Sequence, residues 1–281
     1  MAKTPKAVAL GSALRQARQD KGLKLRDFAL HISRDPAMLS RWENGERSPK
    51  PEQAARILAL LGVTGQRYDE VMTLVHGISE PQWVATTLPE QRQQLAAYID
   101  CERKATAIHA AEPMLIPGLL QTPDYIRAIM STAGVAEDEI ARRVAVRLGR
   151  RKVITRPCPA NLTALVGEPA LFLNVGGPAV LAEQLRHLLA VAQLANVEVR
   201  VVPLSAGWHP GVEGAFNLLE SEGSTMSVFV ETRRTMLWLH QRDDVLAYQR
   251  AAIKMQEVAM SPLDSVRFIS RLLKRMETTD G

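Results

Sequence analysis

The stretch "DPAMLSRWENGERSP", residues 35–49, carries the signals of one short and sharply bounded helix. Asp35 is a good N-cap, because its carboxylate can accept hydrogen bonds from the free N–H groups of the first helical turn. Pro36 follows at the first helical position, where its missing N–H costs nothing and its fixed φ favours the helix. Gly45, after Asn44, can adopt the left-handed conformation that ends a helix. These signals predict a helix of about two and a half turns.

The two faces of this short helix differ in character. Leu39 and Trp42 lie three residues apart on one side, with Met38 beside them, and we expect these side chains to pack inward. The opposite side and the first turn carry small or polar residues and one long cation: Pro36, Ala37, Ser40, Arg41 and Asn44. Such a face lets the backbone approach a surface closely, and an arginine can donate two parallel hydrogen bonds to guanine or to a phosphate.

Four further helices are expected around this one within residues 8–77. Apolar side chains recur there at helical spacing, and glycines or prolines separate the segments. The marker positions are Leu10, Leu14 and Ala17; Leu25, Phe28, Ala29 and Ile32; Ala54, Ile57, Leu58 and Leu61; and Tyr68, Val71, Met72 and Val75. The first 77 residues therefore form an all-α, five-helix domain in this interpretation.

The charge of the chain is concentrated in the same part. Residues 1–77 contain 13 Lys or Arg and 8 Asp or Glu, a net charge of +5, whereas residues 78–281 contain 22 of each. A basic module joined to a neutral one indicates a polyanionic partner for the first module only.

The composition of the 281 residues argues against several other classes of protein. No apolar run approaches the roughly 20 residues that span a bilayer, and no signal-peptide core follows the first residues. Cys101 and Cys158 lie in unrelated contexts without the spacing of a metal or redox pair. We expect a reduced, cytoplasmic protein without a membrane segment.

The run "FALHISRDPAMLSRWENGERSPKP", residues 28–51, resembles the helix-turn-helix of the phage-repressor-like (XRE) transcription regulators. The resemblance implies a recognition helix over residues 35–44, with an Arg18–Glu43 pair holding it to the first helix. Lys24-Leu25 departs from the Ser/Thr-Gln pair common in that family, and the turn lacks a glycine. In this assignment Pro36, Ala37 and Arg41 face the major groove of double-stranded DNA, and Ser40, Asn44, Arg47 and Lys50 lie near phosphates, with Arg34 completing the set. The alternatives are a role for Arg41 at phosphates alone and, for Asn44, a place as an ordinary C-terminal residue of the helix.

The remainder of the chain predicts an α+β domain over residues 89–281, preceded by a linker over residues 78–88. Helical patterns alternate there with strand-like runs that mostly follow one another, which favours a largely antiparallel sheet. The expected helices cover residues 89–111, 123–133, 137–153, 178–194, 243–260 and 262–276. The expected strands cover residues 162–166, 197–204, 216–220, 227–232 and 235–240.

Chemistry-bearing patterns are scarce in this second domain. Histidine and cysteine spacings fit no metal site, and neither a nucleophile elbow nor a phosphate-binding loop is found, so no metal, no cofactor and no enzymatic activity are expected. Seven basic residues over 142–156 follow three acidic ones in the same helix, which favours a solvated amphipathic helix over a second nucleic-acid site. The loop "PLSAGWHPGVEG", residues 203–214, presents Trp208 and His209 as a possible partner or effector loop, with a plain structural loop as the alternative.

The segments "AEPMLIPGLLQTPDYIRAIM", "RRVAVRLGRRKVITRP", "LVGEPAL", "VEVRVVPLSAGWHPGVEGAFNLLE" and "VFVET" resemble the C-terminal domain of Scr1-type, or DUF5753, regulators. That resemblance implies an antitoxin-like transcription regulator that binds a small DUF397-type protein encoded nearby. A short recognition helix reads few base pairs, so we expect a homodimer on a palindromic operator. A ligand-gated regulator and, less favoured, a DNA-tethered enzyme are the competing interpretations.

Overall fold

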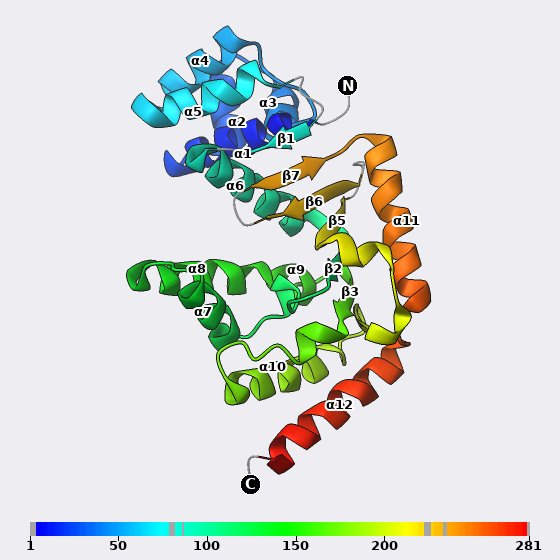
Figure 1. The fold of residues 1–281 in the computed structure, drawn as a ribbon. Coiled ribbons are helices and arrows are strands. Elements are labelled where there is room, and N and C mark those ends of the chain that lie inside the picture. Colours follow the sequence, from blue (N-terminus) through cyan, green and yellow to red (C-terminus); the bar gives the residue numbers. More distant parts are fainter. Residues whose placement is uncertain (1–3, 79–81, 86, 222–225, 233–234, 280–281) are drawn as a thin grey trace. The chain divides into compact units, whose positions relative to one another are not determined.

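The computed structural model describes residues 4–78, 82–85, 87–221, 226–232 and 235–279 (Figure 1). The chain forms two compact units. The first comprises residues 1–101 and 223–245, and the second comprises residues 102–222 and 246–281. The polypeptide first passes from one unit to the other inside a helix, near the end of α6 (Leu88–Lys104).

The predicted five-helix domain is present at the start of the first unit. Its helices are α1 (Pro5–Asp20), α2 (Leu25–His31), α3 (Pro36–Glu43), α4 (Pro51–Leu60) and α5 (Gly65–His76). Helix α1 contacts α3, α4 and α5, α2 packs on α3, and α4 packs on α5. The shared core contains Leu10, Leu14, Phe28, Leu39, Trp42, Leu58 and Leu74, each buried. The apolar spacing of the sequence therefore identified the inward faces.

Helix α3 begins and ends where its capping residues predict. Asp35 Oδ1 accepts hydrogen bonds from the backbone N–H groups of Ala37 at 2.6 Å and Met38 at 3.3 Å. Pro36 is the first helical residue, and Gly45 has a φ of +69° just after the C-cap residue Asn44. The helix has 8 residues, so its length and its direction depend mainly on these two ends and on the residues it buries.

The rest of the first unit adds three antiparallel strands and most of α6. Strand β1 (Gln82–Val84) pairs with β7 (Met236–Leu239), which pairs with β6 (Ser227–Glu231). Trp83 stacks on Trp238 at a centroid distance of 6.4 Å, and Tyr98 of α6 meets Phe229 edge-on at 4.6 Å. Residues 78–88, predicted as a linker, thus contribute a strand, and α6 begins at Leu88.

The second unit contains four strands in the order β5-β2-β3-β4. These strands are β2 (Ala105–Glu112), β3 (Asn161–Gly167), β4 (Val197–Val202) and β5 (Phe216–Ser221). Strand β2 is antiparallel to β5 but parallel to β3, and β3 is parallel to β4. The sheet is therefore mixed: the predicted antiparallel pairing holds for β2 with β5 and for β6 with β7, whereas β2, β3 and β4 run parallel to one another. Helices connect β2 to β3 and β3 to β4, and such crossovers return the chain in the same direction.

Helices make up most of the remaining chain of the second unit. They are α7 (Pro123–Thr132), α8 (Glu137–Arg150), α9 (Lys152–Thr155), α10 (Pro178–Val191), α11 (Arg242–Val258), which starts in the first unit, and α12 (Pro262–Thr279). Helix α12 contacts both α10 and β4, and α7 packs on α8 and α10. Short 3-10 turns are η1 (Gly118–Leu120), η2 (Glu168–Leu171), η3 (Leu204–Ala206) and η4 (Pro210–Glu213).

The predicted helix over residues 89–111 is wrong at its end. Helix α6 stops at Lys104, and the next eight residues form β2. Four of those eight are alanine, a strong helix former that is depleted in strands. Their conformation is decided by pairing with β3 on one side and β5 on the other, which local propensity does not report.

Within the residues described above, no helix is long and apolar enough to cross a membrane. The same residues contain no group of three or more His, Cys, Asp or Glu side chains placed to hold a metal ion.

Candidate nucleic-acid interface

Helix α3 presents the predicted face to solvent. Arg41 and Ala37 are exposed, while Pro36, Ser40 and Asn44 are half-buried. On the other side Leu39 and Trp42 are 1% and 5% exposed, so this side anchors the helix in the core. Met38, expected to face inward, is half-buried. The result is a helix with one rigidly packed side and one accessible side that carries a single long cation.

The basic residues predicted around α3 are accessible as well. Arg34, in the turn before the helix, and Arg47 and Lys50, after it, are all exposed. Arg34 also lines a groove of about 210 Å³ together with Arg56 of α4. Arg56 is exposed as well. It was not predicted as a site residue, because it lies on α4, several residues beyond the helix-turn-helix sequence. Exposed basic residues thus both precede and follow α3 in the sequence.

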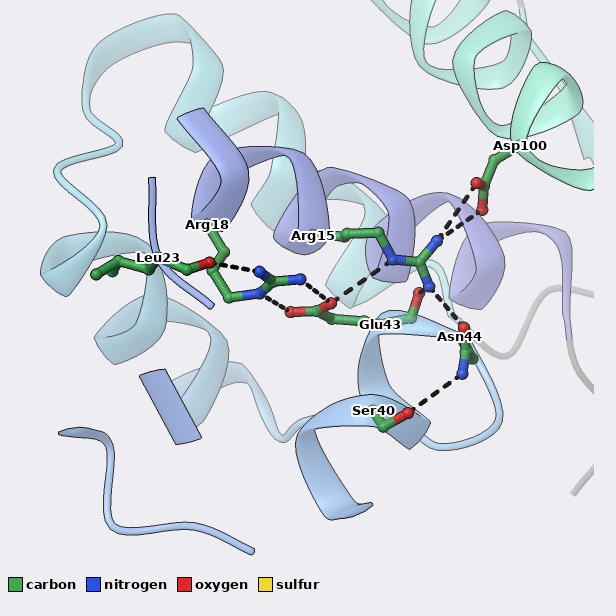
Figure 2. Close-up of polar contacts among 7 residues, drawn as sticks. All are labelled: Arg15, Arg18, Leu23, Ser40, Glu43, Asn44 and Asp100. Carbon is green, nitrogen blue, oxygen red and sulfur yellow. Dashed lines mark hydrogen bonds and ion pairs between the residues drawn. The ribbon is translucent and has the colours of Figure 1, made fainter. Parts of the chain in front are cut away.

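The pair of Arg18 and Glu43 that the family resemblance implied is present (Figure 2). Arg18 donates from Nε to Glu43 Oε1 at 2.6 Å and from Nη2 to Oε2 at 2.8 Å, and from Nη1 to the carbonyl of Leu23 at 2.6 Å. The two side chains are only 8% and 2% exposed. The hydrogen bond to Glu43 raises the pKa of Arg18 above its ordinary value. This bidentate contact holds the last turn of α3 to α1.

A second arginine of α1 binds the end of α3 from another direction (Figure 2). Arg15 Nη2 donates to the carbonyl oxygen of Glu43 at 2.8 Å and to Asn44 Oδ1 at 2.5 Å. Its Nη1 donates to both carboxylate oxygens of Asp100 on α6, at 3.3 and 3.2 Å. Asn44 Nδ2 in turn donates to Ser40 Oγ at 3.4 Å. A continuous polar chain therefore runs from α6 to the accessible face of α3.

Sequence reasoning missed Arg15 and Asp100. The two residues are 85 positions apart, and Asp100 lies in a helix that carried no site signal. The only available indication was the spacing of Arg15 and Arg18, which places both arginines on adjoining parts of one face of α1. Asn44 and Ser40, predicted near phosphates, retain that assignment as a prediction, and their side chains also belong to this internal network.

The basic run over residues 142–156 is largely engaged inside the second unit. Arg142 and Arg143 both pair with Glu139 one turn earlier, and Arg150 binds the buried carboxylate of Glu102 at 2.7 and 2.8 Å. Arg156 donates to the carbonyls of Arg103 and Ala105. These contacts favour the amphipathic-helix interpretation of this run over a second nucleic-acid site.

The loop that follows β4 exposes a group of apolar side chains. Trp208 is 73% exposed, Leu204 69% and Val212 58%. His209 is half-buried, and burial lowers the pKa of its imidazole. The loop is held at its start by the backbone N–H of Leu204, which donates to Glu168 Oε2 at 2.7 Å. Trp208 is thus exposed in this loop together with other apolar side chains, whereas the neighbouring His209 is half-buried.

Comparison with known families gives two profile matches, which follow each other along the sequence and do not coincide with the two compact units. A helix-turn-helix domain profile matches residues 9–71, a segment that begins within α1 and ends within α5. The profile of DUF5753, a domain of unknown function, matches residues 95–271, well over half of the chain. No curated protein matches the chain. The helix-turn-helix domain indicates a DNA-binding regulator, and the chain belongs to the DUF5753 family.

Proposed function

We propose that this protein is a transcription regulator of the XRE type that reads double-stranded DNA with helix α3. The observation that carries the proposal is the construction of α3 itself. Its inner side is buried through Leu39 and Trp42, its last turn is fixed by Arg18 and Arg15, and its outer side exposes Arg41 beside small residues. A helix that is fixed in this way, and whose outer side carries mostly small side chains, can enter a major groove without a change in its own structure.

The division of contacts follows from the positions of the side chains. Arg41, with Pro36 and Ala37 beside it, is the residue that reaches base edges, because a guanidinium can bind guanine O6 and N7 together. Arg34, Arg47 and Lys50 flank the helix and act on the phosphates, as do the donors of Ser40 and Asn44. Base contacts select the sequence, whereas phosphate contacts position the protein and supply most of the salt-dependent affinity.

Replacing Arg41 by alanine is expected to weaken binding to the preferred DNA by about 1–3 kcal/mol and to relax the preference at one base position. The DNA is first selected from a random duplex library with the unaltered chain. Fluorescence anisotropy then measures the affinity of each variant for the selected duplex and for duplexes with single-position changes. Equal affinity and equal base preference in Arg41→Ala would show that α3 is not the reading helix.

Two matched variants separate this effect from general causes. Lys50→Ala removes a cation at the predicted phosphate contact, so it should weaken all duplexes alike and reduce the slope of log K against log salt by about 1. Arg67→Ala removes an exposed arginine of α5 that pairs with Asp20 and should leave the selectivity unchanged. A melting curve for each variant excludes unfolding as the cause.

We further propose that two copies act together and that the second unit has an antitoxin-like role in binding a small DUF397-type protein. A single short helix reads few base pairs, and a second half-site about one helical turn away supplies the missing selectivity. Exposed Leu204, Trp208 and Val212 offer an apolar surface of the kind that protein partners cover. The proposal assigns no enzymatic activity and no cofactor to the chain, and it places the chain with the DNA in the cytoplasm.

Sedimentation of the full chain tests both parts of this proposal. A dimer on the selected duplex, and a heavier complex once a DUF397-type protein encoded beside this gene is added, are the expected results. Trp208→Ala should weaken that second association and leave DNA binding unchanged. A monomer on DNA would remove the paired-half-site proposal, and an added protein that sediments separately would favour a small-molecule effector.

A further inference from the structure

We propose that Arg15 and Asp100 are positioning residues for DNA contact, and that through them helix α6 controls the donor group of Asn44. The inference rests on the proposed reading function of α3. It goes beyond that function because Arg15 lies on α1 and Asp100 on α6, so neither residue lies on the accessible face of α3. Figure 2 shows the hydrogen bonds of Arg15 with Asp100, Glu43 and Asn44.

The guanidinium of Arg15 determines which way the Asn44 amide is turned. An arginine has donors only, so the Asn44 atom that it contacts at 2.5 Å must be the carbonyl oxygen Oδ1. The amide NH₂ group therefore points the other way, toward Ser40 Oγ at 3.4 Å on the accessible side of α3. A phosphate oxygen only accepts hydrogen bonds, so this orientation is the one that lets Asn44 contact the DNA backbone. With the amide reversed, its oxygen would face the phosphate and repel it.

Asp100 determines where the Arg15 guanidinium lies. Its carboxylate receives two hydrogen bonds from Nη1, while Nη2 serves Glu43 and Asn44. The Arg15 side chain is 16% exposed and that of Asp100 is 7%, so water competes weakly for these bonds. The planar guanidinium of an arginine presents its donors in a fixed fork, so it can hold these three residues in one arrangement. Through Arg15, the position of Asp100 therefore affects the positions of Glu43 and Asn44 at the end of α3.

Helix α6 extends this control to the second unit through the covalent chain. Asp100 belongs to the first unit, and Glu102, two residues later on the same helix, belongs to the second. Glu102 is 2% exposed and forms its bidentate pair with Arg150 of α8. Asp100 and Glu102 lie within one turn of α6, and each of them binds an arginine of its own unit. A shift or rotation of this turn therefore changes the hydrogen bonds between Arg15 and Asp100.

The decisive variant is Asp100→Asn in the full chain, measured against the duplex selected by the unaltered protein. We expect its affinity to fall about tenfold, a coupling of ordinary size for linked sites. General electrostatics predicts the opposite sign, because removing a negative charge from a DNA-binding protein should strengthen binding. The direction of the change therefore separates positioning from net charge.

Asp20→Asn is the matched control, since it removes one carboxylate of the same unit that pairs with Arg67 and lies away from α3. It should bind as tightly as the unaltered chain or slightly more tightly. In an Asn44→Ala background, Asp100→Asn should cause no further loss, because the group it positions is gone. Arg15→Lys keeps the positive charge but removes the guanidinium group. It should lose DNA affinity as Asp100→Asn does, and it replaces that variant in the test if Asp100→Asn is too unstable to measure.

The outcomes distinguish this inference from the proposed function. If the unaltered chain selects no DNA sequence, the reading function itself fails. If the chain selects DNA but Asp100→Asn and Arg15→Lys bind like Asp20→Asn, or if Asp100→Asn adds its full loss to that of Asn44→Ala, the positioning role is overturned.

Hydrogen exchange tests the part played by α6. Coupling between sites is reciprocal, so saturating DNA should slow amide exchange in the last turns of α6 in the unaltered chain. The same concentration of bound DNA should not slow it in Arg15→Lys. Identical exchange with and without DNA in the unaltered chain would overturn the link between α6 and the reading helix.

Discussion

Replacing Glu43 by glutamine is expected to lower the free energy of unfolding of the helix-turn-helix domain by about 3–5 kcal/mol. The neutral amide keeps the shape of the side chain but leaves the Arg18 guanidinium, which is 8% exposed, without its carboxylate partner. An arginine cannot release its proton in compensation, so the full cost of a buried, unpaired charge remains. Denaturant unfolding of the full chain, with hydrogen exchange to locate the change in α1 and α3, provides the measurement.

Asp20→Asn is again the matched control, because the Arg67–Asp20 pair has a similar distance of 2.8 Å but side chains that are 50% and 43% exposed. Exposed pairs contribute about 0–1 kcal/mol, so this variant should be close to neutral. Replacing both Arg18 and Glu43 by methionine should recover much of the loss, since no charge is then stranded. A Glu43→Gln cost as small as that of Asp20→Asn would contradict the interpretation of a desolvated pair.

Replacing Gly11 by alanine is expected to destabilise the same domain by about 3 kcal/mol, although alanine is the better helix former. A Cβ at this position of α1 would lie 2.5 Å from the carbonyl oxygen of Trp42 and 2.7 Å from that of Glu43. Both are backbone atoms at the end of α3, so they cannot yield as a flexible side chain would. Relief requires α3 to move away from α1, which stretches the contacts of Glu43 with Arg15 and Arg18.

Gly149→Ala in α8 is the same substitution without the obstacle: apart from the adjacent residues and the backbone of its own helix, no atom of the described residues lies within 4 Å of the added Cβ. It should stabilise the protein by roughly 0.5–1 kcal/mol through helix propensity alone. Opposite signs for the two variants in thermal and denaturant unfolding are the expected result. A neutral Gly11→Ala would show that α1 and α3 are less closely packed than these distances require.

Local signals in the sequence were sufficient for the reading helix. The Asp35-Pro36 start and the Asn44-Gly45 end depend on capping and on backbone dihedral angles, which involve only neighbouring residues, and both ends are where they were predicted. Apolar spacing likewise identified Leu39 and Trp42 as buried, and family resemblance supplied the pair of Arg18 and Glu43. The strands of residues 161–167 and 197–202 were found because each contains a short run rich in Leu or Val that lies between turn signals.

Tertiary structure alone decided the rest, because the deciding interactions join residues that are far apart in the chain. The alanine-rich residues 105–112 form a strand only because β3 and β5 pair with them, and the parallel direction of β2, β3 and β4 follows from where intervening helices return the chain. Gly11 is required by the approach of α3, not by the conformation of α1. Asp100 reaches Arg15 across 85 residues, a contact that no local propensity encodes, and this contact connects the reading helix to α6.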